Sequence, residues 1–248
     1  MLKKLRRISI VSLLFVVSSC GSTKSETERP VNIDEASILA DVLWRNHEAG
    51  GAHFRLVAKS GTAEGDIAIE GDIDWVKHLG YGRVAGGSQP HPVNEVWWDA
   101  HSVAEWRPSL ENEVRKLIPT AMNPVLLRDP EQETRRLDQL LAIIVGLSAS
   151  IPENAQLIFQ KADTSFLRTD VLRNRPVLVF RYGKKTIYWI DEKEKTLLRF
   201  EGNTSTGKYP IIIDFQDFGT KVLSFPRAAS VVKVSEHKEL SALIPNSP

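Results

Sequence analysis

The sequence predicts an α+β domain built on one large, curved antiparallel β-sheet. Two observations carry this expectation. About ten short segments alternate apolar and polar residues with a period of two, as half-buried strands do, and short polar turns separate them. Apolar residues recur at helical spacing only in one segment before the strands and in two segments midway along the chain. No repeat and no long polar linker follows Asn32, so residues 32–248 are expected to form a single domain.

The chain opens with a segment that is typical of an export signal. Four basic residues stand among the first seven, and an apolar run over 8–17 follows that is too short to span a membrane. The run leads into Val17-Ser18-Ser19-Cys20. This resembles the bacterial lipobox, an aliphatic residue and two small residues before a cysteine that is acylated and becomes the new N-terminus. We therefore predict a lipoprotein signal peptide over 1–20. The alternatives are an ordinary signal peptide with a chance cysteine, or a plain membrane anchor.

Loss of this signal changes the charge of the protein. The whole chain has 32 basic and 31 acidic residues, a formal charge of +1; residues 1–20 hold four basic residues and no acid, which leaves 28 against 31, or −3. Both signs are interspersed, so no nucleic-acid partner is expected. Residues 21–31 are polar and predict a tether. The single cysteine, Cys20, excludes an intramolecular disulfide and cysteine-rich zinc sites.

The first helix and the first strands are predicted by local patterns. Asn32-Ile33-Asp34-Glu35 has the spacing of a capping box, and the helix should end before Gly50-Gly51. Segments 54–58 and 67–75 then alternate as a hairpin with one apolar face, and a third strand is expected over 79–85. Two further strands, 95–98 and 103–106, carry three tryptophans. Trp97 and Trp98 are neighbours and point to opposite faces, so at least one ring should lie at the surface or at a pocket mouth.

The middle of the chain is predicted to be helical and the last third to return to strands. One helix follows Ser109; a second begins at Asp129-Pro130, with the aspartate as N-cap, and continues to Val145 as the most apolar segment after the signal. That apolar face must be covered by other elements. Strands are then expected over 156–160, 166–170, 176–182, 186–191, 196–201 and 211–215.

Taken together, these features resemble the LolA-like superfamily, and most of all the actinobacterial LppX/LprG-type envelope lipoproteins. The resemblance covers roughly residues 32–230. Its most specific parts are 186–201, which includes Tyr188-Trp189-Ile190-Asp191, and Ile212 to Gly219. It implies a half-barrel sheet of about 10–11 strands whose concave face, closed by helices, holds acyl chains. Members of this superfamily bind or carry lipids or lipoproteins between the membrane and the outer envelope.

From this resemblance we expect a membrane-anchored lipoprotein that binds a lipid or acylated ligand and carries it across the cell envelope. Its partners would be the membrane, through a lipid on Cys20 at the extracytoplasmic side, and a lipid or lipoprotein ligand. The alternative is an interaction or sensor module with a solid core that binds another envelope protein. The expected cavity lining is Phe54, Leu56, Ile67, Ile69, Trp75, Leu140, Ile144, Phe180, Trp189 and Phe200. The expected surface or pocket-mouth aromatics are Trp97, Trp98 and Trp106.

The sequence offers little for catalysis. It has no Gly-x-Ser-x-Gly elbow, His-Glu-x-x-His motif, P-loop or dinucleotide fingerprint. We therefore predict no catalytic residue, no cofactor and no metal, and an envelope hydrolase is the least favoured alternative. His91 and His101, with Asp99 and Glu105, are the best candidates for a metal site, but a set of polar surface residues is the preferred interpretation.

Overall fold

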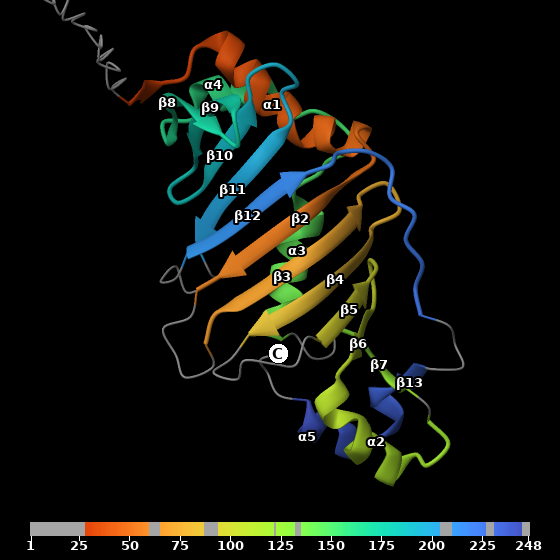
Figure 1. The fold of residues 1–248 in the computed structure, drawn as a ribbon. Coiled ribbons are helices and arrows are strands. Elements are labelled where there is room, and N and C mark those ends of the chain that lie inside the picture. Colours follow the sequence, from red (N-terminus) through yellow and green to blue (C-terminus); the bar gives the residue numbers. More distant parts are fainter. Residues whose placement is uncertain are drawn as a thin grey trace, which may run out of the picture.

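The computed structural model describes residues 28–59, 65–86, 94–121, 123–131, 135–203, 210–226 and 231–244. Cys20 and the predicted signal peptide lie outside the described residues, as does His91. The described part of the chain forms one open sheet of thirteen strands with five α-helices, an α+β fold as predicted (Figure 1). The sheet is mixed, because its last two strands, β7 and β13, are parallel and every other neighbouring pair is antiparallel.

The strand order reflects two meanders joined at the middle of the sheet. It runs β1-β8-β9-β10-β11-β12-β2-β3-β4-β5-β6-β7-β13. The first half holds β1 (Arg29–Pro30), β8 (Thr164–Leu172), β9 (Arg175–Tyr182), β10 (Ile187–Asp191), β11 (Leu197–Asn203) and β12 (Pro210–Gln216). The second half holds β2 (Gly51–Ala58), β3 (Ile67–Asp74), β4 (Leu79–Gly86), β5 (Asn94–Trp98), β6 (Val103–Trp106), β7 (Val125–Arg128) and β13 (Val231–Lys233).

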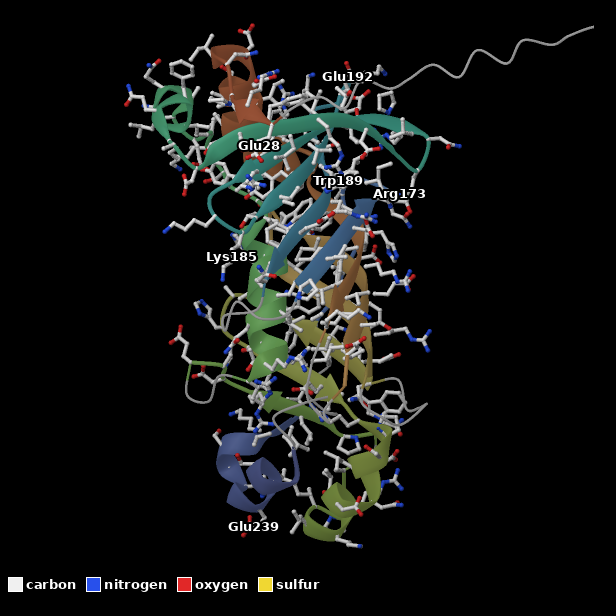
Figure 2. All side chains as sticks on the ribbon, turned by 90° about the vertical axis from the view of Figure 1, so that its left-hand side faces the viewer. Glu28, Arg173, Lys185, Trp189, Glu192 and Glu239 are labelled. Atoms are coloured by element: carbon white, nitrogen blue, oxygen red, sulfur yellow. The ribbon has the colours of Figure 1, made fainter. Side chains whose placement is uncertain are left out.

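The helices gather on one face and at the two ends of the sheet (Figures 1 and 2). Helix α1 (Ile33–Glu48) and helix α4 (Ala155–Gln160) pack together at the end that holds β8. Helix α3 (Arg136–Gly146) crosses one face of the sheet. Helices α2 (Glu111–Leu117) and α5 (Lys238–Leu243), with the 3₁₀ turns η1 (Pro108–Leu110) and η3 (Val234–Glu236), lie at the opposite end. The sheet face that α3 covers is called the core face below.

The capping box at the start of α1 is confirmed. The Asn32 side chain accepts a hydrogen bond from the Glu35 backbone N–H at 2.9 Å, and the Glu35 carboxylate accepts one from the Asn32 N–H at the same distance. The tether is shorter than predicted, because Arg29 and Pro30 pair with β8 as strand β1 and Val31 is buried in the core.

Two predicted elements are corrected by the structure. Residues 156–160, expected as a strand, form helix α4, since the Asn154 side chain caps the N–H groups of Gln156 and Leu157. Helix α3 begins at Arg136 and not at Asp129, whose carboxylate instead accepts the N–H of Glu131 in a turn. The Asp138 carboxylate accepts the N–H of Arg135 and so closes the real start of α3.

Candidate functional site: the core face and helix α3

The core face brings together most of the residues that the sequence predicts as a cavity lining. Cross-strand pairing places Leu56 opposite Ile69 and Ala58 opposite Ile67, with their side chains in the core cluster, and Phe54 opposite Gly71, which leaves space for its ring. One continuous apolar cluster contains nine of the ten predicted residues: Phe54, Leu56, Ile67, Ile69, Trp75, Leu140, Ile144 and Phe180 as buried members, with Phe200 packed against them. The tenth, Trp189, is not among them.

These side chains fill the space between the sheet and α3. Phe54, Leu56, Ile69, Ile144 and Phe180 each have 0% of their surface exposed. A side chain without accessible surface touches neither bulk water nor an internal void large enough to hold a water molecule. The predicted lining residues therefore form a packed core in this structure, and a ligand between α3 and the sheet requires the two to separate.

Aromatic rings lie over glycines on the core face. A Cβ atom on Gly80 would stand 2.0 Å from the Trp98 ring, and one on Gly202 would stand 2.8 Å from the Phe200 ring. Trp98 also meets Phe54 edge to face, with ring centroids 6.0 Å apart. Trp98 is 2% exposed, so its prediction as a surface or pocket-mouth aromatic is wrong. It is the member of the Trp97-Trp98 pair that points inward, because Gly80 opposite it leaves room for the indole.

Polar contacts hold the C-terminal end of α3 to its surroundings. The Trp75 indole N–H donates to the Ile144 carbonyl at 3.1 Å, and the Asn46 side chain donates to the Leu147 carbonyl at 2.8 Å. The Ile144 carbonyl belongs to the last turn of α3 and Leu147 is the C-cap residue that follows it, so both contacts act where helix carbonyls run out of partners along the helix. Asn46 is fully buried on α1 and also accepts the Leu197 N–H of β11 at 3.2 Å, so it joins three elements.

A buried ionic network holds the N-terminal end of α3. The Arg128 guanidinium of β7 donates to both carboxylate oxygens of Asp138 at 2.5 Å and to the Glu105 carboxylate of β6 at 2.8 Å. Arg107 donates to the other Glu105 oxygen at 2.8 Å. All four side chains are at least nine-tenths buried. Because Arg128 binds Asp138 through two hydrogen bonds and Glu105 through a third, the network fixes the position of α3 against β6 and β7.

The network changes the acidity of its members. Burial by itself would raise the pKa of Glu105, but the charges and hydrogen bonds of Arg107 and Arg128 outweigh it and lower that pKa below its usual value. Burial would likewise lower the pKa of Arg128, and Asp138 and Glu105 raise it instead. Glu105 and Arg128 are therefore both charged near neutral pH. No sequence pattern predicts the network, although Glu105 follows Val103 at the next inward-facing position of β6 and Arg107 comes directly after that strand.

Two buried polar atoms on the core face of β5 have no hydrogen-bond partner among the residues that the structure describes. These are the indole Nε1 of Trp98 and the Oδ1 of Asn94, which are 2% and 8% exposed as residues. Val96, between them in the strand, pairs with Glu105 of the ionic network. The interior is therefore apolar along most of the sheet and polar at the end where β5, β6 and β7 meet the start of α3.

The remaining predicted aromatics lie on the opposite, outer face of the sheet. Trp189 pairs in register with Arg199, packs in a separate apolar cluster, and has the guanidinium groups of Arg168 and Arg199 at 5.0 and 5.5 Å from its ring. Trp97 is partly exposed and its ring lies 5.4 Å from that of Tyr81. Trp106 is also partly exposed, next to Glu95.

The outer face carries a neutral row of alternating charges. Neighbouring strands place these side chains in one row across six strands: Arg199, Asp214, Arg55, Glu70, Arg83 and Glu95. Trp189 flanks the row at one end and Trp106 at the other. Opposite charges beside one another in a sheet are stabilising and produce no single-sign field, which is typical of a solvated face. A shallow hollow of about 400 Å³ lies over Ala68, Gly71 and Ala85 in this face.

No metal centre emerges within the described ranges, where no three His, Cys, Asp or Glu side chains converge. Glu105, one of the candidate ligands, is committed to Arg107 and Arg128, and Asp99 accepts the backbone N–H groups of His101 and Ser102. No described helix is both long and apolar enough to cross a lipid bilayer.

Comparison with solved structures identifies the fold. LprF from Mycobacterium bovis superposes with a TM-score of 0.51 at 12% identity, over 80% of this chain and 99% of that one. LppX from Mycobacterium tuberculosis matches at a TM-score of 0.46 and 10% identity, over 77% and 98% of the two chains. A LolA superfamily protein from Nitrosomonas europaea matches at a TM-score of 0.29 and 9% identity, over 78% of this chain and 96% of that one.

The chain therefore shares the fold of LprF. No protein-family model matches the sequence, and no curated protein matches it significantly. At 12% identity the likeness to LprF shows the fold and leaves function to be argued from the residues of this chain.

Proposed function

We propose that this protein is a lipid-anchored envelope lipoprotein that binds an amphiphilic, acyl-chain ligand between α3 and the core face, without covalent chemistry. The carrying observation is the uneven interior. Its middle is apolar, and its end at β5 holds a buried donor, Trp98 Nε1, and a buried acceptor, Asn94 Oδ1, that no group within the described ranges satisfies. An unpaired buried polar group costs about 1–3 kcal/mol, so a core built only to be solid gains nothing from two of them. An amphiphile with a polar headgroup would satisfy both.

The attachment of α3 supports the same proposal. Polar contacts hold the helix at its two ends, through Asp138 at the start and through the carbonyls of Ile144 and Leu147 at the other end. Between them, its apolar side chains pack in the core cluster. Apolar contacts are non-directional and can be exchanged for acyl methylenes at similar free energy. Release of the polar contacts at one end would let the ligand replace α3 side chains on the sheet.

The proposal is tested with cis-parinaric acid, a fluorescent fatty acid, added to the purified protein. We expect saturable binding, and faster uptake by Asp138→Asn, which weakens the attachment to Arg128. Asp170→Asn is the matched control, since its ion pair with Arg168 is exposed on β8. Absence of saturable binding in both the wild type and a folded Asp138→Asn variant would overturn the proposal.

Two adjacent tryptophans test where the ligand lies. Trp98→Phe keeps a smaller aromatic ring on the core face and removes the unpaired donor, so the affinity for parinaric acid should fall roughly 10-fold, the equivalent of one hydrogen bond to a charged group. Trp97→Phe, one residue earlier on the outer face, should leave the affinity unchanged. Equal effects of the two substitutions would contradict the proposed position of the ligand.

A second function is favoured by one observation, the complete burial of the core side chains. A domain whose interior is already filled is suited to bind another envelope protein through its surface, as an interaction or sensor module. The parinaric acid experiment separates the two, since a solid module takes up no acyl chain in either form of the protein.

A further inference from the structure

Exposed apolar side chains are concentrated at one end of the domain. The large apolar residues that remain exposed in the described ranges are Ile33, Val76, Leu117, Ile151, Leu157, Phe159, Val171 and Val222. Half of them belong to the start of α1 and to the segment that contains α4: Ile33 (47% exposed), Ile151 (73%), Leu157 (59%) and Phe159 (45%). Figure 1 shows that α1 and α4 lie at the end where the chain starts, opposite α2 and α5.

Backbone hydrogen bonds hold the α4 segment along α1. The N–H of Ala149 donates to the Leu43 carbonyl at 3.1 Å and that of Glu153 to the Ala40 carbonyl at 2.9 Å, so the segment runs back toward the start of α1. Helix α4 then buries Ile158 in the core and leaves its neighbours in the sequence outside. The exposed side chains therefore sit on a fixed helix, with their apolar groups in water.

The charged groups of this segment are engaged with Tyr182. Lys161 donates to the Tyr182 hydroxyl at 2.9 Å, and that hydroxyl donates to the Glu153 carboxylate at 2.6 Å. The Lys161 ammonium also lies 4.6 Å from the centre of the Tyr182 ring. Between these two charged residues, positions 154–160 carry no charge.

The start of the chain lies next to this end. Strand β1 pairs Arg29 with Phe166 and Pro30 with Ser165, at the beginning of β8, four residues after α4 ends. Cys20 precedes Glu28 by eight residues, which span at most roughly 28 Å even when fully extended. Thirteen strands at a spacing of about 4.8 Å place the far edge of the sheet on the order of 55 Å away. An acylated Cys20 would therefore keep the α1 and α4 end, and not the α2 and α5 end, beside the bilayer.

We propose that this end of the domain rests on the lipid bilayer and that Ile151, Leu157 and Phe159 enter its interface. The inference rests on the lipid anchor of the proposed function. The partner is the apolar boundary of a lipid membrane, because the contacting side chains are uncharged and the nearby charges are already satisfied. Binding should therefore depend little on salt and occur on vesicles of zwitterionic phosphatidylcholine.

The lone cysteine makes a direct test possible. Once Cys20 is acylated, Leu157→Cys or Phe159→Cys provides the only free thiol for an environment-sensitive fluorophore in the full lipidated protein. Leu117→Cys on α2 and Val222→Cys are matched controls, at apolar residues that are 43% and 98% exposed away from this end. In phosphatidylcholine vesicles containing spin-labelled lipid, we expect strong quenching at 157 and 159 and weak quenching at 117 and 222. Equal quenching at all four positions would overturn the proposal.

A second measurement does not depend on the anchor. A chain that starts at Gly21 keeps every residue of the described structure, and its binding to phosphatidylcholine vesicles is measured by flotation. The double substitution Leu157→Asp with Phe159→Asp should weaken binding at least 10-fold at unchanged thermal stability, and Leu117→Asp, at the opposite end of the domain, should leave binding unchanged. Equal binding by all three proteins would overturn the membrane contact. Failure of the anchor itself would appear separately, as a full-length protein that carries no acyl group.

Discussion

Replacement of Gly80 by alanine tests how tightly the core face is filled. The new Cβ would stand 2.0 Å from Cζ2 and 2.1 Å from Cε2 of Trp98, whereas ordinary carbon contacts begin at about 3.5 Å. The indole would have to shift by roughly 1.5 Å, and it is fully enclosed by packed side chains, Phe54 among them. Overpacking of this kind costs about 1–3 kcal/mol, and expulsion of the ring costs about 3–5 kcal/mol. We expect a loss near 3 kcal/mol.

The assay is urea unfolding of Gly80→Ala beside Gly146→Ala. Gly146 is the last residue of α3, and a Cβ there would meet no atom within 4 Å, so alanine should raise the free energy of unfolding by about 0.5–1 kcal/mol through its helix propensity. If Gly80→Ala loses less than about 0.5 kcal/mol, an indole does not lie over Gly80. That result would refute the conclusion that the core face is filled.

Three further predictions concern ionisation, the joint between helices and the anchor. Because the pKa of Glu105 is lowered in the folded protein, its charge stabilises the fold above the unfolded pKa, near 4.5, and this stabilisation is lost as the pH falls through the folded pKa. Glu105→Gln should be about 3–5 kcal/mol less stable than the wild type at pH 7. Urea unfolding measured over a range of pH should show the stabilities of the two proteins converge in acid. Asn46→Ala should lower the free energy of unfolding in urea by about 2–4 kcal/mol, because it leaves the Leu197 N–H and the Leu147 carbonyl without their hydrogen-bond partner. A loss below about 0.5 kcal/mol would contradict the role of Asn46 in joining these elements. Cys20→Ser should abolish labelling of the protein with palmitate, and the protein should be either released from the membrane or left with its signal peptide attached. A processed Cys20→Ser protein that stays bound to the membrane would contradict the lipobox interpretation.

The fold could be predicted because its signals are local. The capping box at Asn32 and the strict alternation of β2 and β3 depend on neighbours in the chain, and each requires one side of its element to be buried. The same reasoning failed at α4. The apolar residues of this six-residue segment, 157–159, are compatible with a strand or a helix. The helix forms because Asn154 caps its first N–H groups and because it packs against α1.

The candidate site was less accessible to sequence reasoning. Alternation tells which residues share a face of one strand, but not which face of the sheet a helix will cover. The sequence pattern groups Trp189 with the inward residues, yet its register partner is Arg199 on the outer face, and its neighbours Tyr188 and Ile190 are the residues of β10 that point inward. The network of Glu105, Arg128 and Asp138 joins residues that are up to 33 positions apart, and no local pattern announces it.

Local chemistry in the chain thus predicts an export signal with its cysteine, and it determines most of the helices and strands and the apolar alternation that requires a buried sheet face, because each depends on residues within a few positions of one another. The fit between α3 and the sheet depends instead on how side chains from distant strands interlock. Only the assembled structure shows Trp98 lying over Gly80 and α3 bound at both ends. Packing is a property of volumes brought together in space, and the same apolar sequence pattern is compatible with a hollow interior or a filled one.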